Sequence, residues 1–255
     1  MGQVPGRASL LLIGDGRLAG HLSFYLRAKE LPLSMWSRRR DPRRTLLPGL
    51  LQQADRVLLA IRDDALAGFV REHRRDGGPL WVHFSGSAAV DGAWSAHPLC
   101  TFSGPPYEKG VYETIPFIVE REGPPLAELI PGLGNPSAAV PRAAKPLYHA
   151  LCVAAGNFTQ LLWRELFRGF EERLGLPAEL ALPYLRQTAH ALERGLEDHL
   201  GNGVLTGPIA RRDTTTIGRN LQALSGAGLD GLAGVYEAFL RLAYSENKPA
   251  MEVAA

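Results

Sequence analysis

The fold is decided by a stretch near the N-terminus, Leu10-Leu11-Leu12-Ile13-Gly14-Asp15-Gly16-Arg17-Leu18-Ala19-Gly20, where an apolar run leads into the spacing G-x-G-x-x-A. Gly14 would permit a tight turn after a buried strand, and Gly16 would let the backbone approach a pyrophosphate. Ala19 is small enough for the next helix to pack closely on the sheet. Because the first N–H groups of that helix are free, we predict a turn that binds dinucleotide phosphates, with a generic strand-to-helix turn as the alternative. The predicted cofactor contacts in the turn are Gly14, Asp15, Gly16, Arg17, Leu18 and Ala19.

The part of the chain before Val140 alternates short apolar runs with amphipathic stretches. Runs rich in Val, Ile and Leu suit strands of a parallel sheet that helices cover on both faces. The stretches Leu18–Lys29 and Asp63–Arg75 predict two of these helices, the second with Asp63 as its N-cap. This alternation predicts an α/β fold with a doubly wound parallel sheet. The predicted strands are Ser9–Ile13, Leu33–Trp36, Arg56–Ile61, Leu80–Phe84 and Pro116–Val119, with a further short segment ending at His97-Pro98-Leu99.

Beyond Val140-Pro141 the strand signal almost vanishes and helical periodicity takes over. Pro146 suits the start of a long helix, since it lacks an N–H that would be unpaired there. Gly175-Leu176-Pro177 and Gly201–Pro208 indicate breaks between helices. We therefore predict an α/β domain over residues 1–141 and an all-helical domain over residues 142–255. The predicted helices of the second domain are Pro146–Phe170, Pro177–Leu200, Thr214–Leu224 and Leu229–Tyr244.

The second predicted strand ends in Met35-Trp36-Ser37-Arg38-Arg39-Arg40. A site that prefers NAD would carry an acidic residue here for the ribose hydroxyls. A hydroxyl and a planar guanidinium suit a 2′-phosphate instead, which a carboxylate would repel. We therefore predict NADP as the cofactor, bound by Ser37 and Arg38, and expect the later arginines to lie too far along the loop. A solvated arginine loop is the alternative reading of these residues, and NAD or a deazaflavin are the alternative cofactors.

Ligands of an open parallel sheet bind beyond the carboxyl ends of its strands, so residues that follow each strand are candidates for the site. The third strand leads to Ile61 and Arg62, and the fourth to Ser85 and Gly86, which could approach a ribose or nicotinamide. His97 lies where substrate and nicotinamide should meet and could donate a proton near neutral pH. A loop histidine bonded to the backbone is the alternative for His97.

Helix Pro146–Phe170 begins at the domain junction, so its first turns should border the cleft. Counted at about 100° per residue, His149 falls on an otherwise apolar stripe with Asn157 at its edge. We predict His149 as a proton donor and Asn157 as a residue that orients the substrate, with a satisfied polar pair in the core as the alternative. Lys145 precedes a proline and is biased away from the helical region, so it would sit at the helix cap and reach substrate or only solvent.

A polar loop, Asn202–Asp213, separates two helices of the second domain. Capping of the next helix would explain Asp213, but it would not explain the Thr-Gly-Pro segment that begins at Thr206. The guanidinium fork of Arg211 suits a carboxylate with two oxygens. We therefore predict Thr206 and Arg211 as substrate-binding residues.

The composition excludes several classes of protein. The chain has 255 residues, 45% of them hydrophobic, and a net charge of +2, which indicates neither a nucleic-acid partner nor a membrane partner. Two cysteines are too few for a disulfide scaffold or a thiolate metal site, and we expect no metal. No stretch approaches the roughly 18 apolar residues of a transmembrane helix. The N-terminal apolar run leads into glycines rather than a cleavage site, so we expect a cytoplasmic protein.

Four motifs occur in order and resemble a known family: His83-Phe84-Ser85-Gly86-Ser87, Ala96–Phe102, Tyr148-His149-Ala150 with Gly156-Asn157-Phe158, and Leu205–Asp213. Together they resemble bacterial Rossmann-like proteins with a C-terminal helical domain of unknown function, the domain of unknown function 2520 family. That family is similar in layout to pyrroline-carboxylate reductases, ketopantoate reductases and β-hydroxyacid dehydrogenases. The resemblance implies a dinucleotide-binding domain followed by an all-α domain like the C-terminal domain of 6-phosphogluconate dehydrogenase, often a dimerisation element.

This sequence departs from the family pattern at three positions. Arg212 stands where the pattern has a glycine, Gly156 where it has a serine, and Asn220 where it has a histidine. These departures bear on the substrate pocket and leave the implied fold untouched.

Two functions are compatible with these features. The first is an NADP-dependent oxidoreductase that transfers a hydride to a small carbonyl or imine substrate, with His97 or His149 as proton donor, Asn157 orienting the substrate and Lys145 as a further candidate. The second is a regulatory or scaffold protein that binds NADP(H) without turnover, which the lack of an unambiguous acid–base pair favours. A helical second domain with apolar stripes makes a homodimer the expected assembly.

Overall fold

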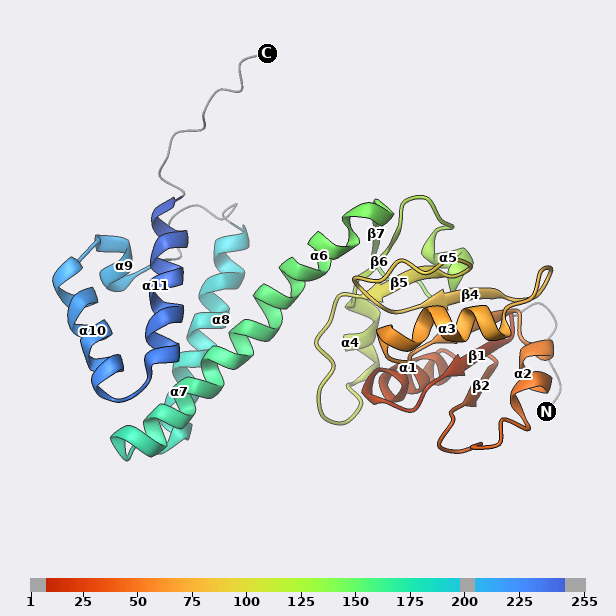
Figure 1. Cartoon of the computed structure of the whole chain (residues 1–255), viewed down its shortest axis with the longest axis horizontal. Coiled ribbons are helices and arrows are strands. Elements are labelled where there is room, and N and C mark those ends of the chain that lie inside the picture. Colours follow the sequence, from red (N-terminus) through yellow and green to blue (C-terminus); the bar gives the residue numbers. More distant parts are fainter. Residues whose placement is uncertain (1–7, 198–204, 246–255) are drawn as a thin grey trace, which may run out of the picture. The chain divides into compact units, whose positions relative to one another are not determined.

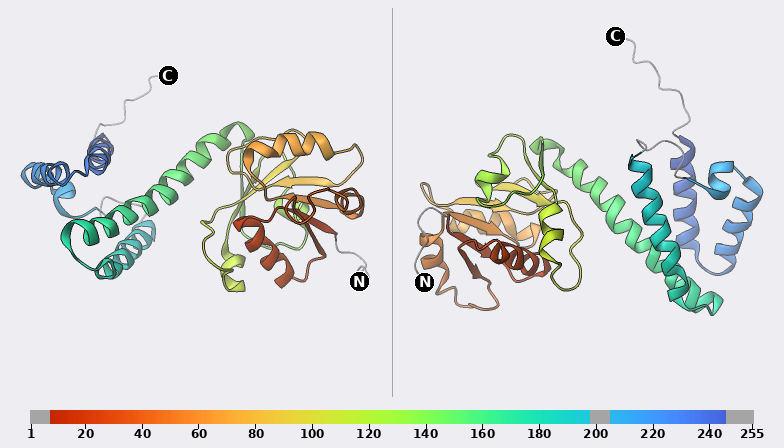
Figure 2. Two further views of the ribbon diagram at one scale, coloured as in Figure 1. Left: turned by 60° about the horizontal axis from the view of Figure 1, so that its bottom comes forward. Right: turned by 180° about the vertical axis from the view of Figure 1, so that it is seen from behind.

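The computed structural model describes residues 8–197 and 205–245 of the chain. The chain divides into two compact units, Met1–Asn157 and Phe158–Ala255. The first unit is an α/β structure and the second is helical (Figures 1 and 2). The predicted succession of an α/β part and a helical part is therefore confirmed.

The first unit is built on one seven-stranded sheet with the strand order β2-β1-β3-β4-β5-β6-β7. All neighbouring strands are parallel except β5 and β6, which pair antiparallel. After β2 the chain crosses to the other side of β1 to form β3, so the strand order reverses between β1 and β3. Ligands of open parallel sheets bind at such a switch point, beyond the carboxyl ends of the strands. The strands are β1 (Leu10–Ile13), β2 (Leu33–Trp36), β3 (Arg56–Leu59), β4 (Leu80–His83), β5 (Trp94–Pro98), β6 (Phe117–Glu120) and β7 (Ser137–Val140).

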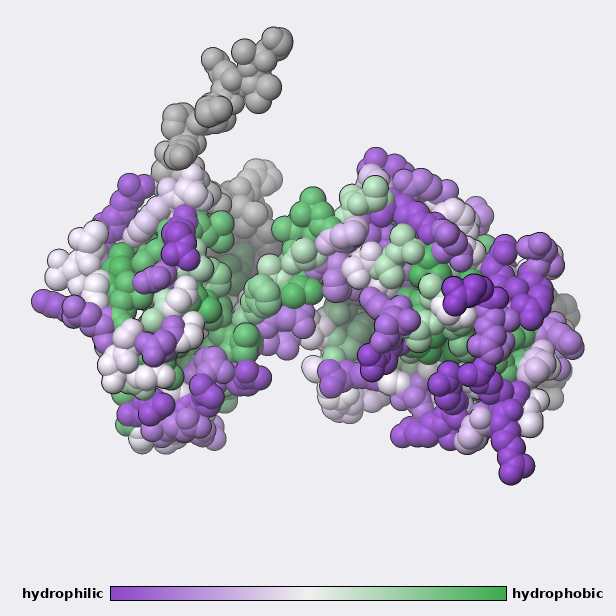
Figure 3. All heavy atoms as spheres, in the orientation of Figure 1, coloured by the Kyte–Doolittle hydropathy of each residue, from purple (hydrophilic) through white to green (hydrophobic). Residues whose placement is uncertain are grey.

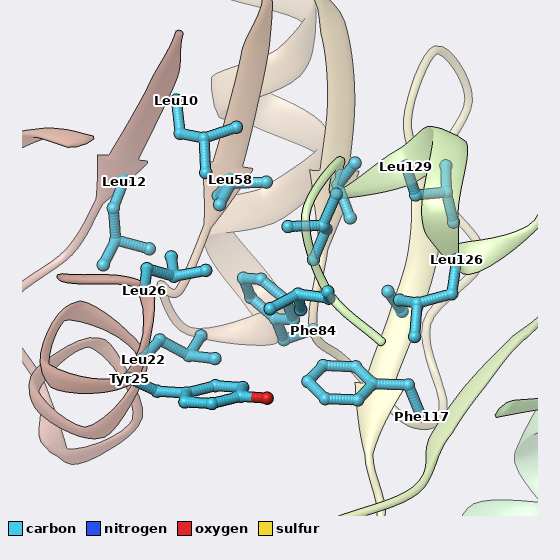
Figure 4. Packing of buried hydrophobic residues seen from close by; sticks show 14 of the residues in the cluster. Leu10, Leu12, Leu22, Tyr25, Leu26, Leu58, Phe84, Phe117, Leu126 and Leu129 are labelled. Atoms are coloured by element: carbon cyan, nitrogen blue, oxygen red, sulfur yellow. The ribbon is translucent and has the colours of Figure 1, made fainter. Parts of the chain in front are cut away.

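Helices cover both faces of this sheet, because β1 is apolar on both. Leu10 and Leu12 belong to one buried cluster with side chains of α1, α4 and α5 (Figure 4). Leu11 and Ile13 belong to a second cluster with side chains of α2 and α3. Strand β1 is therefore apolar at every position because its two faces pack into two separate hydrophobic cores. The helices of this unit are α1 (Arg17–Ala28), α2 (Leu47–Gln53), α3 (Asp63–His73), α4 (Lys109–Thr114), α5 (Leu126–Leu129), the 3₁₀ turn Arg142–Ala144, α6 (Lys145–Cys152) and the π-helical turn Val153–Asn157.

The second unit contains helices only, in the part that the structure describes. Its fully buried apolar side chains are few: among residues 158–195 and 205–245 they are those of Ala181, Ile217 and Ala233. Both large hydrophobic clusters lie in the first unit. The helices of the second unit are α7 (Phe158–Leu174), the 3₁₀ turn Ala178–Ala181, α8 (Leu182–Glu197), α9 (Gly207–Arg211), α10 (Thr214–Gly226) and α11 (Asp230–Ser245).

Several local expectations need correction. Asp63 is the first residue inside α3 and Arg62 is the N-cap, because the Asp63 carboxylate accepts a hydrogen bond from Ser85 instead. Lys145 is helical and opens α6, so the proline that follows it does not exclude it from the helix. The predicted helix Pro146–Phe170 is interrupted by the π-helical turn Val153–Asn157, so a constant 100° count fails along it. The loop expected over Gly201–Pro208 lies in part outside the described residues.

Candidate functional site

The glycine turn after β1 has the geometry that an anion needs. Gly14 has a φ of +136°, and a Cβ on it would lie 2.3 Å from the carbonyl oxygen of Ala60 at the end of β3. Ala19 is fully buried beside it, so the start of α1 packs closely on the sheet. A Cβ on Gly16 would meet no atom within 4 Å, so the space above this residue is open. Gly16 is the N-cap of α1 and offers no side chain to the first N–H groups of the helix, which therefore face that open space.

A cavity of about 1140 Å³ begins at this turn and runs past the ends of β2 and β3 to α3. It therefore lies at the switch point of the sheet, beyond the carboxyl ends of its strands. Predicted cofactor residues from three segments, namely the glycine turn, the loop after β2 and the segment after β3, line it together. The residues that line it are Ile13, Gly14, Asp15, Gly16, Arg17, Leu18, Trp36, Ser37, Arg38, Arg39, Ala60, Ile61, Arg62, Ala65, Gly68, Phe69, Arg71 and Glu72.

The loop after β2 brings two arginines to the cavity. Ser37 is buried, and Arg38 is exposed with no polar partner among the residues that the structure describes. Arg39 also lines the cavity and pairs with the carboxylate of Asp15 in the glycine turn at 2.9 Å, so the expectation that it lies too far along the loop is wrong. The buried carboxylate of Asp41 shapes this loop: it accepts hydrogen bonds from the indole of Trp36 at 2.9 Å, from the backbone amides of Thr45 and Leu46, and from the Thr45 hydroxyl. The Trp36 bond in particular lowers the pKa of Asp41.

The segment after β4 is fixed from three sides. The Ser85 hydroxyl donates to Asp63 at 2.6 Å, and its carbonyl oxygen accepts from Ser95 at 3.0 Å and from the Lys145 ammonium at 3.1 Å. Ser85 and Gly86 do not line the cavity of the glycine turn. Gly86 instead packs against two imidazoles, because a Cβ on it would lie 2.5 Å from His149 and 3.1 Å from His97.

His97 and His149, predicted from segments about fifty residues apart in the sequence, lie together in the first unit. Their ring centroids are 5.9 Å apart and their planes are almost perpendicular. His97 Nδ1 lies 2.7 Å from the hydroxyl oxygen of Tyr148. Burial, and then the neighbouring His149 and Lys145, lower the pKa of His97 to about 4. A pKa this low favours an uncharged imidazole for His97 at neutral pH.

Lys145 lies neither at a solvated helix cap nor at an open surface, since only 2% of it is exposed. Its ammonium is 3.5 Å from the carboxylate of Glu120, which is equally buried and also lies 3.8 Å from Arg142. Burial is the main cause that lowers the pKa of Lys145, and Glu120 opposes it. The ammonium thus ties the end of β6 to the Ser85 carbonyl after β4.

The remaining predicted residues lie elsewhere. Asn157 is exposed at the end of the π-helical turn. In the second unit Thr206 is the exposed N-cap of α9, and Arg211 is exposed at the end of that helix. Asp213 caps α10 by accepting from the Thr216 amide at 3.0 Å, as predicted. At two positions that depart from the family pattern the structure shows the surroundings. The Asn220 side chain donates a hydrogen bond to the Tyr236 hydroxyl. A Cβ on Gly156 would lie at an ordinary contact distance from the Thr101 hydroxyl, so a side chain would fit there.

Sequence reasoning missed Arg39, Tyr148 and Glu120. A charged residue inside an apolar strand was a usable signal for Glu120, because such a residue needs a buried partner. Tyr148 and Arg39 carried no such signal, since their partners lie 51 residues away for Tyr148 and in the glycine turn for Arg39. Within the described ranges, no group of three or more His, Cys, Asp or Glu side chains could hold a metal ion, and no helix is long and apolar enough to cross a bilayer.

Comparison with known proteins agrees with this architecture. Residues 117–242 match the family described as "Domain of unknown function (DUF2520)". No curated protein sequence matches the chain.

Solved structures show the same fold over almost the whole chain. A provisionally named NADP oxidoreductase from Bacteroides fragilis is 24% identical, with 94% of this chain and 98% of that chain covered and a TM-score of 0.70. An imine reductase variant from Myxococcus stipitatus, solved with NAD⁺, is 15% identical over 94% and 95%, with a TM-score of 0.61. A reductive aminase from Aspergillus terreus, solved with NADPH and ethyl levulinate, is 12% identical over 92% and 94%, with a TM-score of 0.56. The predicted fold class is confirmed: the chain has the Rossmann-like fold of these structures, and its residues 117–242 match the DUF2520 family model.

Proposed function

We propose that this protein is an NADP-dependent oxidoreductase that reduces a small carbonyl or imine compound. The observation that carries the proposal is the cavity of about 1140 Å³, in which the glycine turn and the arginine-rich loop after β2 line one continuous space. The structural relatives named as an NADP oxidoreductase, an imine reductase and a reductive aminase support it.

The residues of the cavity fit a dinucleotide with a 2′-phosphate. The open space at Gly16 and the free N–H groups of α1 would receive the diphosphate. Arg38, which has no carboxylate partner among the described residues, would bind the 2′-phosphate with Ser37 beside it. Ile61 and Arg62 would border the adenosine, and Ser85 and Gly86 the ribose of the nicotinamide.

The chemistry would take place next to Gly86. A bound reduced nicotinamide supplies a hydride to the C=O or C=N carbon, and the substrate oxygen or nitrogen takes up a proton. His97 and His149 would contact the reacting group, and Asn157 would orient the substrate. Lys145 would hold the Ser85 segment in place from its buried ion pair with Glu120.

Cofactor binding is tested by titration with NADPH and NADH. Arg38→Ala should weaken NADPH binding by about tenfold to a hundredfold, the cost of losing a charged hydrogen-bonding partner, and should leave NADH binding unchanged. Arg40→Ala is the matched control, because Arg40 lies on the same loop and does not line the cavity. Equal affinity of both nucleotides for wild type and Arg38→Ala would refute the choice of NADP.

Turnover is tested with NADPH and a panel of keto acids, aldehydes, ketones and imines. Oxidation of NADPH with formation of the reduced product would support the enzyme. Binding of NADPH without oxidation across the panel would favour the alternative, a regulatory or scaffold protein that senses NADP(H).

We further propose that the protein is a homodimer formed through the second unit. That unit has almost no buried core among its described residues, and helices α7, α8 and α11 present large apolar side chains to the surface (Figure 3). Such a surface on a soluble protein is typical of an interface between subunits. The exposed residues are Leu161, Leu174, Leu182, Tyr184, Leu192, Val235, Phe239 and Leu242.

A further inference from the structure

The two edges of the His97 ring have different neighbours. Nδ1 faces the hydroxyl of Tyr148, 2.7 Å away, and the two rings meet edge to face with centroids 5.6 Å apart. The opposite edge, with Cδ2 and Nε2, lies against Gly86, whose missing side chain leaves room for it. His97 lies in β5 and Tyr148 in α6, so this contact joins two elements of the first unit.

The proton in the Tyr148–His97 hydrogen bond belongs to the phenol. Burial, and then Cys152 one helical turn away, raise the pKa of Tyr148, so its hydroxyl keeps its proton. The imidazole is neutral at pH 7, with His149 and Lys145 of α6 opposing its charge and Asp63 of α3 favouring it. An imidazole nitrogen is a stronger acceptor than a phenol oxygen, and a phenol is a stronger donor than a neutral imidazole N–H. The hydroxyl therefore donates to Nδ1, and the single ring proton sits on Nε2.

Nε2 of His97 is open to a ligand. It has no hydrogen-bond partner among the residues that the structure describes. The Nε2 atoms of His21, His73 and His83 are fully buried without a hydrogen-bond partner, and that of His97 is not among these buried atoms. The hydrogen bond between Tyr148 and Nδ1 thus orients the ring so that its accessible Nε2–H lies beside Gly86.

We propose that Tyr148 is a positioning residue that fixes the Nε2–H tautomer of His97, so that His97 gives the substrate a neutral hydrogen bond rather than a proton. This inference rests on the proposed reductase function and narrows its substrate class by excluding iminium ions, which leaves carbonyl compounds and neutral imines. A carbonyl oxygen has a lone pair to accept the bond and gains charge as hydride arrives, whereas a protonated iminium nitrogen has no lone pair to offer. The proton that completes the alcohol then comes from water.

The tautomer is tested by long-range ¹H–¹⁵N NMR at neutral pH on protein labelled with ¹⁵N-histidine, with His97→Gln identifying the His97 signals. We expect the pattern of an Nε2–H imidazole whose Nδ1 accepts a hydrogen bond. In Tyr148→Phe the Nδ1 resonance should move to the value of a nitrogen without a partner. An Nδ1–H pattern in the wild type, or an Nδ1 resonance that does not move in Tyr148→Phe, would overturn the proposal.

A kinetic measurement separates this inference from the proposed function. Tyr148→Phe should lower kcat for a carbonyl substrate by about tenfold, the worth of one oriented hydrogen bond, and leave NADPH affinity unchanged. Tyr236→Phe is the matched control, because it also removes a phenol oxygen but lies in the second unit. Wild-type kcat in Tyr148→Phe would contradict the positioning role while NADPH-dependent turnover itself still stood. A wild-type protein that prefers iminium compounds would contradict the substrate class.

Discussion

Arg212 shows how one residue resolves two demands on the backbone. It ends α9 with a φ of +52°, the left-handed conformation that glycine adopts without strain, and its guanidinium carbon lies 5.4 Å from the ring centroid of Tyr244. The cation–π contact with Tyr244 offsets part of the backbone strain. The structure thus gives a physical reason for the glycine that the family resemblance leads us to expect at this position.

Arg212→Gly should raise the free energy of unfolding by about 1 kcal/mol, because relief of the left-handed strain exceeds the lost contact with the Tyr244 ring. Urea denaturation measures the change. In a Tyr244→Leu background the gain should be larger, since no cation–π contact remains to be lost. A loss of stability in both backgrounds would show that the conformation is not strained.

Buried histidines make the protein sensitive to acid. Burial lowers the pKa of His83 to about 3 and that of His97 to about 4, against an ordinary value of 6.5 in the unfolded chain. Between the lowered pKa values of the folded protein and 6.5, the unfolded chain therefore binds more protons than the folded protein does. The stability that is present above pH 6.5 is consequently lost as the pH falls toward 4. His83→Gln should flatten this fall, which urea midpoints across the range would reveal. An unchanged slope would mean that His83 is not the group that titrates on unfolding.

At the residue scale, the sequence indicated several side chains that lie together near the strand ends, but it did not indicate their hydrogen-bond and ion-pair partners. His97 and His149 meet, and Ser37 and Arg38 line the cavity of the glycine turn. The burial of Lys145 at the start of α6 could not be predicted, because its carboxylate partner Glu120 lies in strand β6, 25 residues earlier in the sequence. Hydrogen bonds between distant segments depend on tertiary packing, which a local pattern does not contain.

At the scale of elements, the strands β1 to β4 and the helices α1 and α3 follow the predicted pattern within a few residues. β7 was missed because Ser137–Val140 is short, exposed and rich in small residues. The antiparallel pairing of β5 with β6 was also missed, since strand direction is set by the connection and not by the apolar run itself. The π-helical turn has no sequence signature that a helical period could reveal.

The π-helical turn Val153–Asn157 contains one residue more than an α-helix would need. Deleting Ala155 should remove the π-helical turn, let the helix continue with α-helical hydrogen bonds, and change the position of Asn157 relative to His149. NADPH affinity should stay unchanged, because no residue of the turn lines its cavity, and turnover should fall at least about tenfold because Asn157, the predicted substrate-orienting residue, is displaced. Titration and steady-state kinetics measure the two quantities, with Ala155→Ser as the control that keeps the length. Wild-type turnover in the deletion variant would show that the turn has no role in the site.

At the scale of the whole molecule, the division into an α/β part and a helical part was predictable, because the apolar period changes once along the chain. The first compact unit includes α6 and the π-helical turn and ends at Asn157, whereas the predicted boundary between the domains lies after residue 141. The described helices of the second unit are amphipathic but do not enclose a large core of their own, which the helical period alone did not indicate.

The proposed dimer is tested on α11. Phe239 is 42% exposed there, and Phe239→Glu should convert a dimer into monomer, because a charge cannot be buried in an apolar interface without a partner. Light scattering coupled to size-exclusion chromatography measures the mass. Leu46→Glu, at an exposed leucine of the first unit, should remain dimeric. A monomeric wild type would contradict the proposal.

The account depends on the glycine turn holding a diphosphate, and the most direct measurement is NADPH titration of Gly16→Val. A side chain at Gly16 meets no protein atom within 4 Å and the backbone there is extended with φ −75°, so the fold should be unaffected while the phosphate space is filled. Gly20→Val, also without a neighbour within 4 Å but outside the cavity, is the matched control. We predict that Gly16→Val keeps its thermal stability and loses NADPH affinity by more than about a hundredfold, whereas Gly20→Val binds like wild type. Wild-type NADPH affinity in Gly16→Val would contradict the account.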